Sequence, residues 1–511
     1  MSGLQPPADQ AALAEQRGLA GWLPRRLAAE APSILVIGDV MLDGWWSGSI
    51  DRLCREAPAP VVEINRRDAA PGGAANTAMN LAALGARVTL AGLIGCDDAG
   101  AALKRQLRAA GVNVSDLQEH PGMVTTTKTR VSSGGQVLLR LDDVAREIPP
   151  DALEALAASV PSLLQGQDAV VVCDYGAGAL HGPVGTSLLE VLARRPAALL
   201  TVVDAHDPRP WAPLRPDIAT PNALEAARML DVRLPEGSQR AAVVAEHRDR
   251  LVRATGARSV VVTLDRDGTV LLPAAGNIHR TWARPATEKQ ASGAGDTFVA
   301  ALTLARAAAL PLTTSLDLAQ AAADVVVHYP GTSVCSTAEL SRYLESFADT
   351  AVDAGELVRH VQAHRSEGQR IVLTNGCFDV LHRGHTRYLN QAKQLGDILV
   401  VALNSDDSVR RLKGPERPIN TVGDRAAVIA ALSCVDYVTV FDTPTPIPLI
   451  EALQPEIYAK GGDYTPEMLA ETEAVERYGG SVTILDYVAE LSTSAVVRRI
   501  RNGEGAAVGE S

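Results

Sequence analysis

The chain has 511 residues, of which 46% are hydrophobic and 21% are charged, and its formal net charge is −12. This length allows two or three domains with full hydrophobic cores, and the composition is ordinary for a globular protein. The acidic balance argues against general binding to nucleic acid or to anionic membranes, although a local basic site can still bind a phosphorylated small molecule.

Cysteine usage and hydropathy favour a cytoplasmic protein. The six cysteines are scattered and form no CxxC motif, so we expect reduced thiols rather than a disulfide framework or a zinc site. No apolar run approaches membrane-spanning length, and the opening MSGLQPPADQ lacks the basic start and apolar core of a secretory signal. We therefore expect neither a membrane segment nor a secretory signal.

The first two thirds of the chain alternates between buried strands and helices. A tail or short helix at 1–31 comes first, and residues 71–76 form a turn that opens a helix of small residues. The segments 124–131 and 136–141 have the pattern of a hairpin. Apolar runs predict strands at 33–38, 87–94, 168–173, 199–203 and 259–264. Such alternation predicts a mainly parallel sheet covered by helices.

The sharpest chemical feature of this part is Gly293-Ala294-Gly295-Asp296, which opens a later helix of small residues. Small residues at a helix N-terminus expose backbone N–H groups that can hold an anion, and the adjacent Asp can take a proton from a hydroxyl. Phosphoryl transfer needs these two parts, a positioned base and fixed dipoles where charge spreads. The alternative interpretation is a helix cap chosen for close packing. No GxxxxGK[ST] motif is present, which excludes a P-loop kinase.

Four motifs in this order resemble the ribokinase-like family of sugar kinases over about 33–345. They are Gly38-Asp39, the turn at 71–76, Asn222 with Glu225, and GAGD. The resemblance implies an α/β/α kinase domain at 32–347, with Asp296 as catalytic base and Gly293, Ala294 and Gly295 as anion hole. The residues implied in sugar binding are Asp39, Asp43, Gly72, Gly73 and Asn76. Asn222 and Glu225 would organise the region of Mg²⁺ and the phosphates of ATP.

Three positions depart from that family's pattern. Gln290 replaces an Asp that often helps to hold a monovalent cation, so such a cation at the kinase site is an open alternative. Ala177 and His206 stand where close relatives carry lysines that could meet a phosphate. Charge-assisted hydrogen bonds contribute roughly 1.5–3 kcal/mol each, so the kinase reaction is expected to be slow, altered in substrate, or lost.

A second alternating region follows at 369–501, after a polar, helical linker at 348–368 and before a tail at 502–511. Strands are predicted at 371–375, 398–403, 435–440, 456–459 and 482–485, and helices at 384–395, 422–432 and 493–500. His382-Arg383-Gly384-His385 follows the first strand and opens a helix. Such a helix start attracts anions, and the two histidines share its face. GxFDxxHxGH in this context resembles the HxGH nucleotidyltransferase superfamily, which implies a smaller Rossmann-like α/β domain with His382 and His385 as catalytic residues.

Further segments resemble the bacterial heptose-phosphate adenylyltransferases. Lys413 and Arg417 supply two cations on a loop predicted at 413–418. Taken alone, KGGDY at 460–464 could be a simple turn, and Ser492 with Thr493 an N-cap. Together they extend the predicted nucleotide site, whose members are Thr374, Gly376, Phe378, Asp406, Lys413, Arg417, Lys460, Gly461, Ser492 and Thr493. No direct protein ligand of a metal can be assigned from the pattern.

The two domains together resemble the bacterial enzymes that join a heptose 7-phosphate kinase to a heptose 1-phosphate adenylyltransferase. The resemblance implies ATP and Mg²⁺, heptose phosphates as substrates, a separate heptose-bisphosphate phosphatase acting between the steps, and a homodimer or higher oligomer. The product would be ADP-heptose, a precursor of lipopolysaccharide core or another glycan.

Two alternatives stay open at this stage. In one, only the C-terminal domain is active, and the kinase-like domain is degenerate or acts on another sugar. In the other, the HxGH domain is a cytidylyltransferase that acts on a polyol phosphate such as glycerol 3-phosphate.

Overall fold

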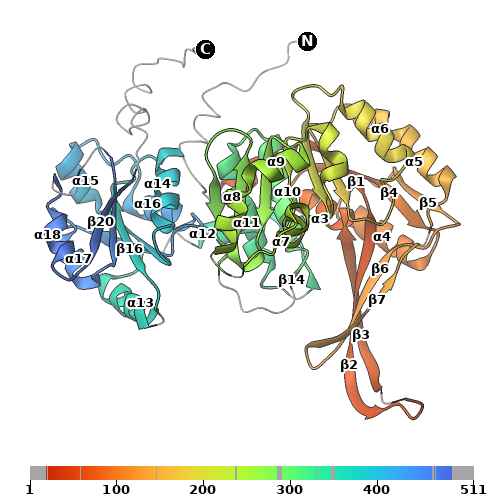
Figure 1. Ribbon diagram of the computed structural model, residues 1–511, viewed down its shortest axis with the longest axis horizontal. Helices are drawn as coiled ribbons and strands as arrows, with labels where there is room; N and C mark the ends of the chain where they lie inside the picture. Colours follow the sequence, from red (N-terminus) through yellow and green to blue (C-terminus); the bar gives the residue numbers. More distant parts are fainter. Residues whose placement is uncertain are drawn as a thin grey trace. The chain divides into compact units, whose positions relative to one another are not determined.

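The computed structural model describes most of the chain in two compact units (Figure 1). Residues 24–340 form one unit, and residues 341–511 with 1–23 form the other. Undescribed residues are 1–18, 20, 58, 146, 236, 238, 285–290, 330, 347–350, 367, 382, 463–464, 466–467 and 486–511. Gln290, His382, Ser492, Thr493 and the helix predicted at 493–500 therefore lie outside the described residues. Among the described residues, no helix is long and apolar enough to cross a membrane.

The larger unit is built on a nine-stranded sheet in the order β13-β12-β11-β10-β9-β8-β1-β4-β5. Its strands are β1 (Ser33–Gly38), β4 (Arg87–Gly95), β5 (Leu117–His120), β8 (Ala169–Asp174), β9 (Leu200–Ala205), β10 (Ile218–Ala219), β11 (Ser259–Thr263), β12 (Thr269–Pro273) and β13 (His279–Thr281). Every neighbouring pair is parallel except the two that involve β12. The predicted mainly parallel sheet is confirmed.

Helices cover both faces of this sheet. They are α2 (Leu23–Glu30), α3 (Ala74–Ala83), α4 (Asp98–Ala109), α5 (Pro150–Leu163), α6 (Pro183–Leu192), α7 (Ala223–Leu230), α8 (Gln239–Glu246), α9 (Arg248–Thr255), α10 (Ala294–Ala307), α11 (Leu312–Val326) and α12 (Thr337–Glu345). Leu35 and Val170 pack with α5 and α6 in one core. α3 and α10 contact β1, β8 and β9, and the strand residues between those of the first core point to the other side. The fold is α/β/α.

A four-stranded sheet extends from the larger unit (Figure 1). Its order is β3-β2-β6-β7, with β2 (Val40–Leu53), β3 (Pro60–Gly73), β6 (Thr127–Ser133) and β7 (Gln136–Asp143). The predicted hairpin is β6 and β7, which pair antiparallel. β2 was not predicted, because its sequence has no clean alternation and its last five residues are exposed.

The smaller unit contains a five-stranded parallel sheet in the order β18-β17-β16-β19-β20. Its elements are α13 (Ala354–Ser366), β16 (Ile371–Gly376), α14 (Arg383–Lys393), β17 (Ile398–Asn404), α15 (Asp406–Lys413), α16 (Val422–Ala430), β18 (Tyr437–Phe441), α17 (Ile447–Leu453), β19 (Ile457–Gly461), α18 (Glu471–Glu476) and β20 (Ser481–Leu485). The strand order reverses at β16, so a crevice is expected where the carboxyl ends of β16 and β19 diverge.

The helix predicted in the linker is α13, and it packs as part of the smaller unit. Leu357 and Val361 are fully buried in the core that also contains Ile371 and Val400. The predicted domain boundaries themselves stay predictions.

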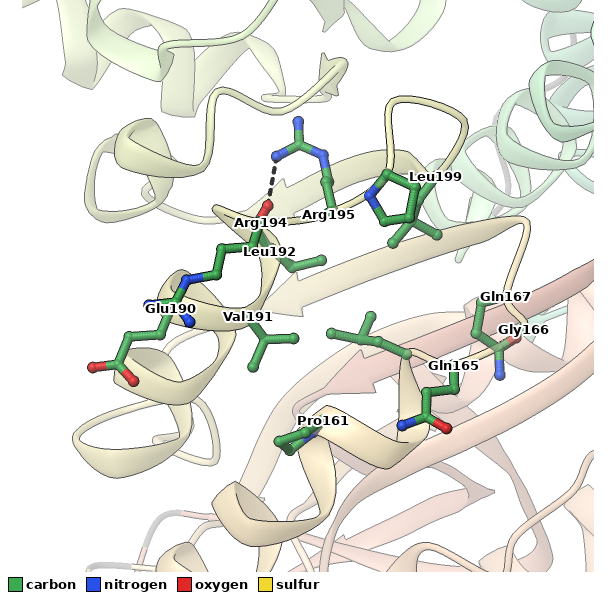
Figure 2. A pocket seen from close by; sticks show the side chains of 12 residues that line it. Pro161, Gln165, Gly166, Gln167, Glu190, Val191, Leu192, Arg194, Arg195 and Leu199 are labelled. Atoms are coloured by element: carbon green, nitrogen blue, oxygen red, sulfur yellow. Dashed lines mark hydrogen bonds between the residues drawn. The ribbon is translucent and has the colours of Figure 1, made fainter.

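One cavity, of about 550 Å³, lies at the end of α5 and α6 (Figure 2). It is lined by residues that precede β8, such as Gln165, and residues that precede β9, such as Arg194. These are the amino ends of the strands. Ligands of open α/β sheets bind at the carboxyl ends, so the cavity is separate from the candidate site of this unit.

Candidate active sites

Gly293 allows α10 to begin against α3. Its φ of 90° is left-handed, and a Cβ there would lie 2.6 Å from Nδ2 of Asn76 and 3.0 Å from Cγ2 of Thr332. No atom of the described residues lies within 4 Å of a Cβ built on Gly295. The first turn of the 14-residue helix α10 therefore has space beside Gly295, and a helix N-terminus of this kind can serve as an anion hole.

Asp296 is held by a chain of amides that crosses the unit. Nδ2 of Asn76 donates a 2.7 Å hydrogen bond to Oδ2 of Asp296, although the two residues are 220 positions apart. Nδ2 of Asn80 donates to Oδ1 of Asn76 at 3.0 Å, and Oδ1 of Asn80 accepts from Oγ1 of Thr297 at 3.0 Å. These bonds fix the orientation of the Asn76 amide, so that its N–H points at the carboxylate.

Two residues that we had not predicted as site members complete the surroundings of Asp296. The hydroxyl of Tyr175 donates to Oδ2 of Asp204 at 2.6 Å and lies 3.4 Å from Oδ1 of Asp296. Oγ1 of Thr220 donates to Oδ1 of Asp204 at 2.8 Å. Asp39 follows β1, Tyr175 follows β8 and Asp204 lies near the end of β9, so the site occupies the carboxyl edge of three adjacent strands.

The pKa of Asp296 suits a general base. Burial, together with the charges of Asp204 and Asp43, raises this pKa to about 7, although the hydrogen bonds from Asn76 and Tyr175 oppose the shift. Burial likewise raises the pKa of Asp204 to about 6. A base with a pKa near the working pH combines a useful fraction of the charged form with adequate basicity.

The kinase rate is therefore expected to rise with pH and to reach half its plateau near pH 7, where Asp296 loses its proton. An Asp of ordinary pKa, about 4, would be charged over the whole neutral range. The measurement is kcat/KM for ADP release between about pH 5.5 and 8.5. Asn76→Ala removes a bond that stabilises the carboxylate, so its midpoint should move to higher pH. A flat profile in both proteins would contradict the assignment.

The two aspartates predicted to bind sugar, Asp39 and Asp43, have different partners. The carboxylate of Asp39 accepts hydrogen bonds from the backbone N–H groups of Tyr175 (2.9 Å), Ala177 (2.9 Å) and Ala179 (3.1 Å), and thus anchors the loop that carries Tyr175. Asp43 accepts from Nη1 of Arg130 at 3.1 Å and lies on β2.

The two glycines of the turn make room for these aspartates. A Cβ on Gly72 would lie 2.5 Å from Oδ2 of Asp43, and one on Gly73 would lie 2.8 Å from the carbonyl oxygen of Asp39. Gly73 also has a φ of 56°, which favours glycine. Contact of any of these residues with a sugar stays a prediction.

Asn222 and Glu225 form a capping box at the start of α7. Oδ1 of Asn222 accepts from the Glu225 N–H at 3.0 Å, and Oε2 of Glu225 accepts from the Asn222 N–H at 2.8 Å. Oε1 of Glu225 lies 2.8 Å from Nδ1 of His206, and this contact raises the pKa of His206. This contact places the capping box close to the carboxyl end of β9, which His206 follows. The role of Asn222 and Glu225 toward ATP and Mg²⁺ stays a prediction.

In the smaller unit, the segment between β16 and α14 places His385 beside Phe378. Phe378 has a left-handed φ of 44°, its side chain is buried, and its ring centroid lies 5.2 Å from that of His385. A Cβ on Gly376 would lie 2.8 Å from the Phe378 ring, so this glycine permits the turn. His385 lies in the first turn of α14, where the helix dipole favours anions.

Two ion pairs, each with one buried partner, hold the loops around this segment. Nε of Arg417 donates to Oδ2 of Asp379, whose Oδ1 accepts from the backbone N–H of Ile419 at 2.6 Å. Nη2 of Arg417 is buried and has no partner among the described residues. Arg425 was not predicted as a site residue. It donates to the carbonyl oxygens of Cys377 (2.6 Å) and Asn404 (2.9 Å), and to Oδ1 of Asp406 (2.7 Å).

Arg425→Ala is expected to destabilise the smaller unit by about 3 kcal/mol, because it leaves two backbone carbonyl groups and the half-buried carboxylate of Asp406 without their donor. Urea unfolding followed by Tyr fluorescence or circular dichroism would measure this as an earlier C-terminal transition. The control is Arg410→Ala, which removes an exposed pair with Asp407 and should change stability by less than about 0.5 kcal/mol. Equal losses of stability in Arg425→Ala and Arg410→Ala would show that the hydrogen bonds of Arg425 do not hold these segments together.

Three further predicted nucleotide residues, Thr374, Lys460 and Gly461, lie toward the carboxyl ends of β16 and β19. Nζ of Lys460 donates to Oδ1 of Asn375 at 2.8 Å, and burial lowers its pKa. The Thr374 hydroxyl hydrogen-bonds to that of Tyr388, and a Cβ on Gly461 would lie 2.9 Å from the Tyr388 ring.

One predicted location was wrong. Lys413 was placed on a loop, but it is exposed in the last turn of α15. The helix continues to this residue because Gly414, with a φ of 95°, is the C-cap.

The fold and the two sites define a two-domain transferase, a sugar kinase followed by a nucleotidyltransferase. The pfkB family carbohydrate kinase model matches residues 31–339, and the cytidylyltransferase-like model matches residues 373–499. The bifunctional protein HldE of Alcanivorax borkumensis is 40% identical over 473 residues, which cover 92% of this chain and 97% of that protein. HldE of Hahella chejuensis is 38% identical over 476 residues, with coverage of 92% and 97%. The chain belongs to the family of bifunctional HldE proteins.

A solved structure supports the fold of the kinase domain. Phosphofructokinase-2 from Escherichia coli, in complex with potassium, superposes with a TM-score of 0.51 at 19% identity. The match covers 61% of this chain and 98% of that chain.

Proposed function

We propose that the chain carries out two steps of ADP-heptose synthesis, with domains at 32–347 and 369–501. The first phosphorylates heptose 7-phosphate at C1, and the second joins AMP from ATP to heptose 1-phosphate. The observation that carries the kinase step is Asp296, a half-buried residue in the first turn of α10 whose pKa is raised by desolvation to about 7. Membership of the HldE family supports the assignment of both reactions to one chain.

In the kinase step, Asp296 takes the proton of the C1 hydroxyl while that oxygen attacks the γ-phosphorus of ATP and ADP leaves. The N–H groups of Gly293, Ala294 and Gly295 stabilise the charge on the transferred group. Asp43, Gly72, Gly73 and Asn76 surround the sugar, and Asp39 holds the Tyr175 loop in place.

Mg²⁺ would enter with ATP. Among the described residues, no cluster of three or more His, Cys, Asp or Glu side chains could hold a metal ion alone. Mg²⁺ in kinases is characteristically bound through substrate phosphates, waters and one or two carboxylates. Glu225 would supply such a carboxylate and would act there with Asn222. A monovalent cation near Gln290 stays a further prediction.

In the second step, a phosphate oxygen of the sugar attacks the α-phosphorus of ATP, and pyrophosphate leaves. A sugar phosphate is already ionised, since its second pKa is about 6, so no protein base is required. His385 with His382, and Arg417 with its unpaired Nη2, would neutralise the triphosphate. Thr374, Gly376, Phe378, Asp406, Lys413, Lys460, Gly461, Ser492 and Thr493 are the residues proposed to surround the nucleotide.

The 7-phosphate must be removed between the two steps, so a separate phosphatase is a required partner in the pathway. We also propose a cytoplasmic homodimer or higher homo-oligomer. The supporting feature is the edge strand β7, on which Val137, Leu139 and Leu141 alternate and are 41–46% exposed. Light scattering during size-exclusion chromatography measures the mass of the particle.

The nucleotide preference of the second domain tests this function against its closest alternative. The purified chain is given heptose 1-phosphate with ATP, and separately glycerol 3-phosphate with CTP, and pyrophosphate release is measured. We expect release only in the first reaction. Release only with CTP and the polyol phosphate would replace the proposal with a cytidylyltransferase.

A further inference from the structure

Lys128 of β6 lies directly beside Asp43 in the sheet that extends from the kinase unit. The two residues are partners in the parallel β2–β6 ladder. Partner residues on adjacent strands are about 4.8 Å apart and project from the same face of a sheet. Lys128 therefore projects from the face that carries Asp43.

That face meets the kinase site at several points. Oγ1 of Thr332 lies 3.3 Å from Oδ2 of Asp43, and Thr332 pairs with Ser292, which immediately precedes the anion hole. The charge of Asp43 contributes to the raised pKa of Asp296. The charge of Lys128 in turn acts on the His206 ring, whose protonation it opposes.

The ammonium group of Lys128 makes no hydrogen bond or ion pair with any residue that the structure describes. Its two ladder partners are Asp43 and Asp142. Arg130 binds Asp43 at 3.1 Å, and Arg140 binds both oxygens of Asp142 at 2.8 Å. Arg130 and Arg140 thus pair with both carboxylates beside Lys128. The half-buried ammonium of Lys128 is left without an opposite charge among the described residues.

We infer that Lys128 binds a phosphate group in the kinase site, and so supplies from the extended sheet a cation that Ala177 and His206 do not supply. A lysine ammonium on a flexible stem is a common phosphate ligand. The inference rests on the proposed kinase function. The phosphate is either the γ-phosphoryl group of ATP or the phosphate already on the sugar, and the experiment separates the two.

The test compares Lys128→Met, which keeps the length of the stem, with Lys128→Arg, which keeps the charge. Calorimetry measures the Kd of heptose 7-phosphate and of the non-hydrolysable ATP analogue AMP-PNP, and ADP release gives kcat/KM. We expect Lys128→Met to lower kcat/KM by about 10- to 100-fold, the usual effect of losing a charge-assisted hydrogen bond, and Lys128→Arg to restore most of it. The matched control is Lys104→Met, because Lys104 pairs with Glu119 on another part of the unit.

The binding constants identify the source of the phosphate. Weaker binding of the sugar phosphate alone assigns Lys128 to the substrate's own phosphate, and weaker binding of AMP-PNP alone assigns it to ATP. If Lys128→Met behaves like Lys104→Met, or if Lys128→Arg is as impaired as Lys128→Met, the inference is wrong. A wild-type protein that binds neither ligand would instead refute the proposed kinase function.

Discussion

Asp296→Asn is expected to lower kinase turnover by about 10²- to 10⁴-fold, the range for loss of a general base, and to leave adenylyl transfer unchanged. The amide has the shape of the carboxylate and can still accept the hydrogen bond that Asn76 donates, so the fold of the site should persist. It cannot take a proton from the sugar hydroxyl. ADP release from heptose 7-phosphate and ATP measures the first activity, and pyrophosphate release from heptose 1-phosphate and ATP measures the second.

A buried Asp elsewhere in the same unit provides the control for this experiment. Asp317 lies on α11, is 4% exposed, and pairs with His279 at 3.5 Å. Asp317→Asn removes a buried charge from the same unit but should leave the kinase rate close to that of the wild type. Full kinase activity in Asp296→Asn would show that this carboxylate is not the base, and the kinase-like unit would then need another mechanism or another role.

His385→Ala should abolish most of the adenylyl transfer, with a loss of about 10²- to 10³-fold, the effect of removing one donor to developing charge. His385 lies in the first turn of α14 against the Phe378 ring. There its imidazole N–H and the helix dipole would act on the same phosphates. Pyrophosphate release is the measurement, and kinase activity should not change.

His360→Ala is the matched control for this variant. His360 lies on α13 in the same unit, its side chain is 42% exposed, and its nearest carboxylate is Glu356 at 3.9 Å. Its removal should affect neither activity. Comparable losses in the two variants would mean that the His385 effect is structural and not catalytic.

The strands and helices that position both sites could be predicted, because short local sequence patterns determine them. The apolar run of β1, the small-residue helix α3 and the glycine-rich start of α10 each carry a signal within about ten residues. The same holds for β16 and the helix α14 behind it. The chemistry of the side chains at these helix starts then suggests their roles. Asp296 and His385 were selected as candidate catalytic residues in this way.

The partners of these residues could not be predicted because they come from distant parts of the chain. Asn76 was assigned to the sugar, and its hydrogen bond to Asp296 spans 220 positions. Tyr175 and Asp204 lie in segments that were noted only for absent lysines. Asp39 was also assigned to the sugar, but three backbone N–H groups bind its carboxylate. Side-chain chemistry in a sequence does not distinguish a group that anchors a loop from one that faces a ligand.

The burial of Arg425 and the length of β2 could not be predicted either, because both depend on distant parts of the chain. Arg425 opens a helix in the sequence, where a solvated position is the ordinary expectation. In the structure its guanidinium is buried and links the segment after β16 to the end of β17 and the start of α15. β2 owes its length to pairing with β3 and β6 rather than to its own alternation. Lys128 becomes informative only once that pairing places it beside Asp43.

The central claim is that one chain catalyses both reactions, and product analysis by mass spectrometry tests it most directly. The protein is incubated with heptose 7-phosphate, ATP and Mg²⁺, before and after addition of a heptose-bisphosphate phosphatase. We expect the 1,7-bisphosphate alone in the first sample and ADP-heptose only in the second. If no bisphosphate forms, while supplied heptose 1-phosphate still yields ADP-heptose, the kinase half of the claim is contradicted.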